Sequence, residues 1–468
     1  MRSLVLVILA VFFLSQCTTE KKQVPVKSWA PTYQVATGKP IAMELTIYKT
    51  TMIANGTDKM TARVAAIDST GREIKDAAMP FTIHVTGDAT ISGAGLTRVK
   101  TDSSTYWEAK LVNGVFNFTF LAGTKPDKIK LEVRGEKTWP ASHEIHTLPA
   151  DFSDLKPTNI QLKPTGKSID RMLGADISFL PQMENRGAKF TVNGKETDAI
   201  KALADNGFNY IRLRIFVNPE NDKGYDPKSG FCGLDATKKM AKRVKDAGMK
   251  LLLDFHYSDY WADPQQQYKP LAWEKMDFEQ LKSTVREYTK SVLLALQEQG
   301  TLPDMVQVGN EINHGLLWPD GHISNPDNLA SLLKAGIEGV HDVNPATPVM
   351  MHLALGGQNE EAVFWLDNML ARDIKFDAIG LSYYPRWHGT LDDLQNNISD
   401  LAKRYGKPIN VVEYSQYAEE LNDIIFSLPN DLGKGTCNWE PLRSMFGKSG
   451  VANENLFVYS KISAKYFK

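Results

Sequence analysis

The chain contains 468 residues, which is longer than one compact hydrophobic core usually allows, so we expect two or more domains. Its formal net charge is −1, which gives no electrostatic reason to expect binding to nucleic acid, an anionic membrane or a strongly acidic substrate. Aromatic residues form 10% of the chain, a share that suits sugar stacking and a large core equally.

The N-terminus has the pattern of an export signal. Arg2 precedes an apolar run over residues 4–14, and Cys17 follows at the position expected for cleavage. This pattern predicts a lipoprotein signal peptide over residues 1–16 and a lipid on Cys17. A plain signal peptide cleaved nearby is the alternative, since the run is too short to span a bilayer as a helix. Residues 17–37 are polar and are expected to form a tether.

Cysteine spacing points to neither a metal site nor a disulfide framework. Cys232 and Cys437 are the only cysteines besides Cys17, and they lie far apart without a CxxC or similar ligand spacing. We expect free, partly buried thiols, and a bond between these two stays open.

Residues 38–160 are expected to form an Ig-like β-sandwich. Short segments of alternating apolar and polar residues are separated by turn signals such as Asn55-Gly56, which is typical of antiparallel strands in two sheets. At the level of fold, this region resembles the Ig-like modules of bacterial surface proteins and glycosidases. Trp107 and Trp139 are assigned to the core or an interface rather than to sugar stacking. The expected strands are residues 42–48, 60–67, 81–85, 115–120 and 129–133.

After a Pro-rich linker at residues 149–168, strands alternate with amphipathic helices, most clearly at residues 234–247 and 278–299. Eight such units predict a (β/α)8 TIM barrel, an α/β fold, over residues 165–468. An open doubly wound sheet would need a Gly-rich phosphate loop after the first strand, and residues 174–176 do not form one. The expected strands are residues 174–178, 210–216, 250–256, 305–308, 349–353, 378–383, 409–413 and 435–439.

All eight expected strands end in polar or aromatic residues. In a parallel barrel these ends meet on the rim where catalysis takes place. Packing explains one or two such residues, but not a set at every strand. The positions are Asp176, Arg212, Arg214, Asp254, His256, Tyr257, Asn310, Glu311, His352, Tyr383, Tyr384, Glu413, Trp439 and Glu440.

Two carboxyls stand out on this rim. Glu311 ends the fourth strand and Glu413 the seventh, so they are expected to face each other across the barrel mouth. Glycoside hydrolysis needs such a pair, because one group protonates the leaving oxygen and the other attacks the anomeric carbon or activates water. Asn310 is placed to bond the sugar 2-hydroxyl and the nucleophile, and Trp439 to form a floor beneath the sugar. A helix cap at Asn310 and Glu311 is the structural alternative.

Charged neighbours are expected to separate the roles of the two glutamates. Arg212 and Arg214, together with Tyr384, are expected to keep Glu413 ionised by charge and hydrogen bonding. The resulting negative charge is expected to keep Glu311 protonated.

Five segments resemble glycoside hydrolase family 53, the endo-β-1,4-galactanases. The longest are residues 254–264, with the letters DFHYSDYWADP, and residues 307–315, with QVGNEINHG. The resemblance runs from about residue 171 to the C-terminus and implies a retaining (β/α)8 enzyme with Glu311 as acid/base and Glu413 as nucleophile. The other similar segments are residues 174–178, 211–219 and 380–389.

The resemblance also implies sugar contacts from rim residues. Three tryptophans, Trp261, Trp273 and Trp387, either line the cleft or pack under a loop. The full set assigned to substrate binding is Asp176, Arg212, Asp254, His256, Trp261, Asn310, His314, Tyr384, Trp387 and Trp439.

Two departures from the family pattern bear on cofactors and subsites. Bacterial members often carry a long loop with a calcium site after the seventh strand, whereas residues 414–436 contain no Asp-x-Asp-x-His run. We therefore expect no metal, no cofactor and altered subsites there. The eighth strand reads Cys437-Asn438 where aromatics are usual, which affects the local packing but not Trp439.

The leading hypothesis is a monomeric, retaining endo-β-1,4-galactanase acting on galactan or type I arabinogalactan. We expect it at the surface of a Gram-negative bacterium, anchored in the outer membrane through Cys17, with the sandwich lifting the barrel from the membrane. No nucleic acid partner is expected. One alternative is a retaining endo-β-glycanase acting on mannan or cellulose. Another is a non-catalytic glycan-binding surface lipoprotein, which the presence of both Glu311 and Glu413 disfavours.

Overall fold

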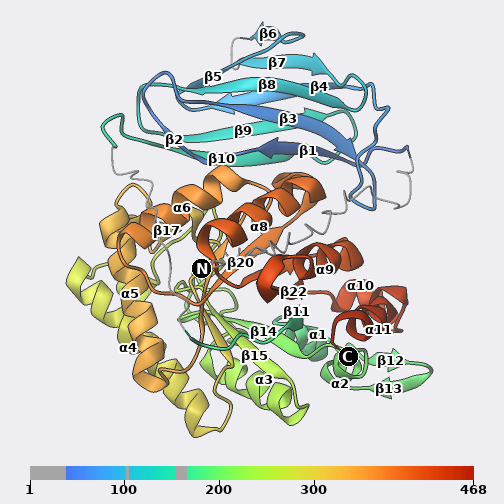
Figure 1. Ribbon diagram of the computed structural model, residues 1–468, viewed down its shortest axis with the longest axis vertical. Coiled ribbons are helices and arrows are strands. Elements are labelled where there is room, and N and C mark those ends of the chain that lie inside the picture. Colours follow the sequence, from blue (N-terminus) through green and yellow to red (C-terminus); the bar gives the residue numbers. More distant parts are fainter. Residues whose placement is uncertain (1–37, 102–104, 153–165, 468) are drawn as a thin grey trace, which may run out of the picture. The chain divides into compact units, whose positions relative to one another are not determined.

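The computed structural model of the protein describes residues 38–101, 105–152 and 166–467 (Figure 1). The predicted signal peptide, Cys17 and the tether lie outside these ranges, so those predictions stay open. Within them, no helix has both the length and the apolar character needed to cross a bilayer. Cys232 and Cys437 are free, buried thiols.

The N-terminal part is a sandwich of two sheets, as predicted. Its sheets have the strand orders β1-β3-β8-β5 and β2-β10-β9-β4-β7-β6. β2 pairs in parallel with β10, while β9 pairs with β10 in the antiparallel sense. The strands are β1 (Ala42–Ile47), β2 (Thr51–Ile53), β3 (Lys59–Ile67), β4 (Pro80–Thr86), β5 (Ala89–Ser92), β6 (Thr97–Lys100), β7 (Thr105–Lys110), β8 (Val115–Ala122), β9 (Lys128–Gly135) and β10 (Ala141–Leu148).

Alternation along the strands fixes which face of each sheet is buried. Phe116, Phe118 and Phe120 of β8 point to one side and join the apolar core between the sheets. Trp107 belongs to the same core, which confirms its predicted role. Trp139 is 69% exposed, so the prediction that it packs in a core or interface is wrong.

Eight parallel strands close into a barrel in chain order, which confirms the predicted fold class. The strands at residues 305–308, 349–353 and 378–383 have the predicted bounds, and the others differ by at most two residues. The barrel strands are β11 (Met172–Asp176), β14 (Tyr210–Ile215), β15 (Lys250–Phe255), β16 (Met305–Val308), β19 (Val349–Leu353), β20 (Ala378–Tyr383), β21 (Ile409–Tyr414) and β22 (Gly433–Trp439).

Helices lie around the outside of the barrel strands (Figure 1). α3 and α4 occupy the two segments predicted as the clearest helices, and α4 begins with a capping box between Asp277 and Gln280. The main helices are α1 (Leu180–Asn185), α2 (Ala199–Asp205), α3 (Leu234–Asp246), α4 (Phe278–Glu298), α5 (Pro326–Val343), α6 (Asn359–Ala371), α7 (Pro385–His388), α8 (Leu391–Tyr405), α9 (Ala418–Phe426), α10 (Leu442–Phe446) and α11 (Glu454–Tyr466).

The loops that connect these strands and helices contain short elements of their own. Two small two-stranded sheets lie outside the barrel, and three short 3-10 helices occur in loops. They are β12 (Phe190–Val192) with β13 (Lys195–Thr197), β17 (Gly315–Leu316) with β18 (Gly321–His322), and the 3-10 helices η1 (Leu271–Trp273), η2 (Ile312–His314) and η3 (Pro429–Asp431).

Candidate active site

The inside of the barrel is built in layers. Each strand contributes one residue to an apolar plug, made of Met172, Tyr210, Leu252, Met305, Met350, Ala378, Val412 and Cys437. Side chains two positions further along a strand point inward again, one layer nearer the carboxyl ends. On four strands this next layer is polar. Its members are Arg212, Asp254, Gln307 and His352.

Arg212 connects the polar layer. Its side chain is 1% exposed, and Nη1 donates to Asp176 Oδ2 at 3.0 Å and to Glu413 Oε1 at 2.8 Å. Nη2 donates to Asp254 Oδ2 and to Asn310 Oδ1, both at 2.8 Å. One buried guanidinium therefore satisfies three buried carboxyls, which is the condition under which such charges are tolerated in a protein interior.

A bulge turns Glu413 toward this arginine. Along β20 and β21, Leu381 pairs with Val411, but Ser382 pairs with Glu413, so Val412 is an extra residue. Val412 already belongs to the plug inside the barrel. Strict alternation would send Glu413 outward, and the bulge allows it to follow Val412 into the site.

The surroundings of Glu413 favour its ionised form as far as a buried site allows. Burial raises the pKa of Glu413, and the contact with Arg212 opposes that shift. The Tyr384 hydroxyl donates to Glu413 Oε2 at 3.2 Å. Arg212 and Tyr384 thus have the positions predicted for them.

Arg214 does not share that role. Its Nη1 lies 2.7 Å from Glu440 Oε1, and its guanidinium lies 4.2 Å from the centre of the Trp261 ring and 4.4 Å from that of Phe179. It therefore pairs with Glu440 beneath an aromatic wall. The prediction that an arginine pair holds Glu413 is wrong, because Arg212 makes that contact alone.

Glu311 sits in a different environment from Glu413. Its backbone is left-handed, with φ 49° and ψ 52°, and Ser382 Oγ donates to Oε1 at 2.6 Å. Ser382 Oγ also lies 2.9 Å from His352 Nε2. Burial raises the pKa of Glu311 well above its usual value, and the charge of Glu413 adds to that shift. Only the second cause is expected from the sequence, whereas burial is the larger of the two.

The pair is therefore asymmetric. Glu413 is buried and Glu311 is partly exposed to the pocket, and only Glu413 touches Arg212. As the two groups titrate together, the first proton leaves Glu413 and the remaining proton stays on Glu311. This division suits one acid and one nucleophile in the same site.

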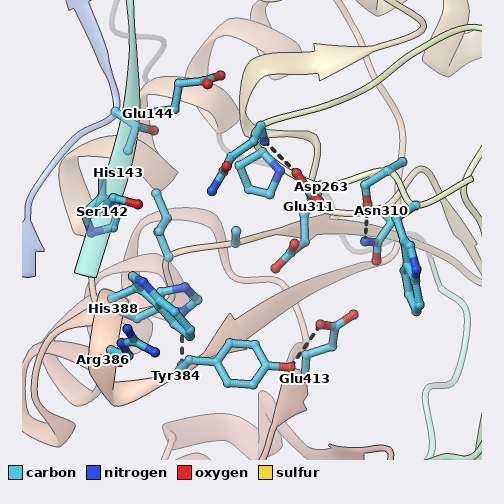
Figure 2. Close-up of a pocket in the computed structure, with 18 of the residues that line it drawn as sticks. Ser142, His143, Glu144, Asp263, Asn310, Glu311, Tyr384, Arg386, His388 and Glu413 are labelled. Carbon is cyan, nitrogen blue, oxygen red and sulfur yellow. Dashed lines mark hydrogen bonds between the residues drawn. The ribbon is translucent and has the colours of Figure 1, made fainter. Parts of the chain in front are cut away.

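Glu311 and Glu413 both line one cavity of about 610 Å³. Figure 2 shows them on its wall, with Tyr384 reaching Glu413. Barrel side chains make up most of this wall. Those predicted to bind substrate are Trp261, Asn310, Tyr384, Trp387 and Trp439, joined by Asp263, Leu355, Arg386 and His388.

Four predicted sugar-binding residues lie beneath the pocket instead of along it, each at most 3% exposed: Asp176, Arg212, Asp254 and His256. His256 Nε2 lies 3.1 Å from Asp254 Oδ2, and its Nδ1 accepts from the Ala262 amide at 3.0 Å. These groups position the residues above them. Asn310 reaches the pocket. It was predicted to bond Glu413, but it accepts from Arg212 and donates to the Ala262 carbonyl instead.

His314 is placed differently from the prediction. It is fully buried, its Nδ1 lies 2.8 Å from the Pro264 carbonyl, and its Nε2 lies 3.0 Å from Thr50 Oγ1 of the sandwich. Its ring stacks on His146 at 3.9 Å between centroids. Both ring nitrogens are occupied, so a sugar contact does not fit. Trp273 likewise packs in the apolar core.

Sequence reasoning missed Ser382, Gln307 and the supporting role of His352. Gln307 accepts from Arg212 Nε at 3.2 Å and donates to Asp254 at 2.6 Å. The available signal was a single polar residue inside an otherwise apolar strand, at position 307 of β16 and at position 382 of β20.

The family model of glycosyl hydrolase family 53 matches residues 172–444, which is more than half of the chain and the whole barrel. The chain belongs to glycosyl hydrolase family 53. A model named glycoside hydrolase family 2 C-terminal domain 5 matches residues 43–144, within the sandwich. The barrel is thus a glycosidase domain, and the sandwich resembles a module found with another glycosidase family.

Curated relatives agree with this family. The chain is 38% identical to a probable arabinogalactan endo-beta-1,4-galactanase A of Aspergillus terreus, over 64% of this chain and 94% of that protein. It is 39% identical to arabinogalactan endo-beta-1,4-galactanase A of Aspergillus niger, over 55% of this chain and 74% of that one. Among solved structures, the Ignisphaera aggregans GH53 catalytic domain matches with a TM-score of 0.59 and 33% identity, covering 64% of this chain and 98% of that domain.

The segment after Glu413 is short in this family 53 barrel, as expected, and the sandwich packs there. α9 follows β21 after a few residues. The Tyr417 hydroxyl donates to the Gly71 carbonyl at 2.8 Å, and Arg72 pairs with Glu420 at 3.1 Å. Over residues 38–101, 105–152 and 166–467, no three His, Cys, Asp or Glu side chains gather in a way that could hold a metal ion.

Proposed function

We propose that this protein is a retaining endo-β-1,4-galactanase. The observation that carries the proposal is the asymmetric carboxyl pair, with Glu413 bonded to Arg212 and Glu311 lining the same pocket. The family supplies the reaction class, and the names of the Aspergillus relatives indicate galactan as the substrate.

In the first step, Glu413 attacks the anomeric carbon while Glu311 gives its proton to the glycosidic oxygen. The bond to the leaving sugar breaks, and a galactosyl ester forms on Glu413. In the second step, Glu311 takes a proton from water and the water oxygen attacks the same carbon. This step releases Glu413 as a carboxylate and returns the proton to Glu311, so the product keeps the β configuration.

The substrate is tested by product analysis on linear β-1,4-galactan, arabinogalactan, mannan and cellulose. We expect short β-1,4-galacto-oligosaccharides from the first two and no cleavage of the others. Preferential cleavage of mannan or cellulose would replace galactan in the proposal and leave the carboxyl mechanism intact. NMR of fresh product should show the β anomer first, and an initial α anomer would contradict retention.

The two glutamates are assigned by Glu413→Gln and Glu311→Ala. Each variant should lose about 10³-fold or more of its galactan hydrolysis while keeping the wild-type melting temperature. With azide and an aryl galactoside, the Glu311→Ala variant should regain activity and form a β-galactosyl azide, because the ester on Glu413 still forms. Activity of Glu413→Gln close to wild type would remove Glu413 from the nucleophile role.

We further propose that Cys17 carries a lipid that anchors a monomeric enzyme to the outer membrane of a Gram-negative bacterium. The proposal rests on the basic start, the apolar run over residues 4–14 and the following cysteine. Labelled palmitate should enter the wild-type protein and not a Cys17→Ser variant. Equal release of both proteins into the medium would contradict the anchor.

A further inference from the structure

One wall of the active-site cavity belongs to the sandwich and not to the barrel. The cavity that Glu311 and Glu413 line is also lined by residues of β10 and its approach, Pro140, Ser142, His143 and Glu144, and by Thr50. Figure 2 shows Ser142, His143 and Glu144 across the pocket from Asn310. A spacer that only lifts the barrel from a membrane would have no reason to reach this cavity.

The alternation of β10 turns Ser142 and Glu144 toward the barrel, whereas His143 has the parity of the sandwich core. Ala141 and Ile145 belong to the core of the sandwich, so residues of the other parity point the opposite way. His146, on that second face, stacks on His314 of the barrel at 3.9 Å between ring centroids. Ser142 and Glu144 share this face with His146. They are partly exposed, whereas His146 is buried, so they border open space in the cavity.

Buried contacts fix β2, which pairs with β10, against the barrel. Glu361 of α6 accepts hydrogen bonds from the Thr50 and Thr51 amides at 2.8 and 3.1 Å, and from Thr51 Oγ1 at 3.1 Å. These residues are at most 5% exposed. Trp387, which lines the cavity, also packs against the core of the sandwich. The wall is therefore an integral part of the site.

The wall carries groups that suit sugar hydroxyls. Glu144 Oε1 lies 2.6 Å from Lys128 Nζ and 3.0 Å from His146 Nε2, which hold the carboxylate in place. Lys128 Nζ also donates to the Gln265 carbonyl, on a barrel loop that lines the cavity, at 3.2 Å. A held carboxylate accepts hydrogen bonds from hydroxyls, and the Ser142 hydroxyl can donate and accept.

The wall lies at the leaving-group end of the cleft. Trp439 on β22 and Trp261 after β15 form the aromatic end, where the sugar that reacts with Glu413 would stack. The sandwich contacts the segments that follow β16, β19 and β20, through His314, Glu361 and Trp387. It also contacts the segments after β15 and β21, through Gln265 and Tyr417, but neither tryptophan of the aromatic end. A chain held on Trp439 must extend past the acid Glu311 toward that side.

We propose that β10 forms the binding wall for the galactosyl residues beyond the cleaved bond, with Ser142 and Glu144 as their hydrogen-bond partners. This inference rests on the proposed galactanase function. It makes the sandwich a determinant of substrate length and product pattern.

The test compares two substrates on Ser142→Ala, Glu144→Gln and the double variant. Linear galactohexaose occupies the leaving-group end, whereas 4-nitrophenyl β-1,4-galactotrioside places only an aryl group there. We expect kcat/KM on the hexaose to fall about tenfold for the double variant, and kcat/KM on the aryl substrate to stay within about twofold of wild type. Glu136→Gln, an exposed glutamate in the turn after β9, is the matched control and should change neither.

Each outcome decides between the two claims. A wild-type enzyme that leaves galactan intact would overturn the proposed function itself. If the wild-type enzyme cleaves galactan but the Ser142 and Glu144 variants behave like Glu136→Gln on both substrates, only the proposed role of the β10 wall would be overturned. An equal loss on both substrates would also overturn it, since that pattern reports damage to the catalytic pair. A bulky Ser142→Trp variant gives an independent check, because it should shift the products from galactan without slowing cleavage of the aryl substrate.

Discussion

Ser382 donates a hydrogen bond of 2.6 Å to Glu311, the residue that we propose as the general acid. The same hydroxyl lies 2.9 Å from His352 Nε2, and His352 is buried with a lowered pKa, chiefly because of that burial. Because Ser382 gives its only proton to Glu311, the neutral imidazole completes this chain of hydrogen bonds in the tautomer that carries its proton on Nε2. This arrangement fixes the direction of the bond that Glu311 receives.

Removing that bond should change the pH profile. The Ser382 hydroxyl lowers the pKa of Glu311, so Ser382→Ala should raise it and move the alkaline limb of kcat/KM upward by about half a pH unit to one unit. We also expect kcat to fall about tenfold, because the acid loses its orientation. Ser331→Ala, on the exposed part of α5, is the control. An unchanged or lower alkaline limb would contradict the role given to Ser382.

Arg212 should be needed for both folding and activity. Replacing it by Met leaves the buried carboxyls of Asp176, Asp254 and Glu413 without their cation, which should cost about 3–5 kcal/mol of unfolding free energy. Arg212→Lys keeps the charge but loses the fork that reaches all these partners, and we expect kcat/KM to fall about 100-fold with a smaller loss of stability. Urea denaturation and galactan kinetics measure the two effects. A fully active lysine variant would show that charge alone suffices.

The docking of the sandwich should depend on one carboxylate. Glu361→Ala leaves the buried Thr50 and Thr51 amides unpaired, which should cost about 1–3 kcal/mol for each amide. We expect faster hydrogen exchange at residues 50 and 51 and faster proteolysis between the two domains. Glu360→Ala, an exposed neighbour on the same helix, should have neither effect. Exchange rates equal to wild type would mean that other contacts hold the sandwich.

Acid should destabilise the interface through a histidine cluster. Burial lowers the pKa of His146 and His314 to about 3 and that of His322 to about 4, from the ordinary 6.5. The unfolded chain therefore binds more protons below pH 6.5, so their contribution is complete above that pH and is lost as the pH falls toward the folded values.

At pH 5 this loss should be on the order of 2 kcal/mol for each histidine relative to neutral pH. Chemical denaturation between pH 7.5 and 4.5 measures it. His322→Gln should flatten the dependence on pH, because it removes one of the titrating groups while its neighbours stay buried. A slope that the substitution leaves unchanged would assign the acid sensitivity to other groups.

The barrel was predictable because its pattern is local. An apolar strand, a polar end and an amphipathic helix repeat along the chain, and the strand at residues 305–308 has the bounds that its apolar letters predict. The sandwich was harder. β10, with the letters ASHEIHTL, was missed because the face carrying Ser142, Glu144 and His146 meets the barrel and not water or the sandwich core.

The sequence by itself determined the fold class, the family resemblance and the two glutamates that we assign to catalysis, because these depend on short motifs and on strand ends that share one rim. Only the tertiary structure decided how the groups meet. The extra residue Val412 turns Glu413 inward, Arg214 pairs with Glu440, and His314 contacts Thr50 of the sandwich instead of the sugar. Each depends on a register or a contact between segments distant in the chain, and no local pattern encodes such pairing.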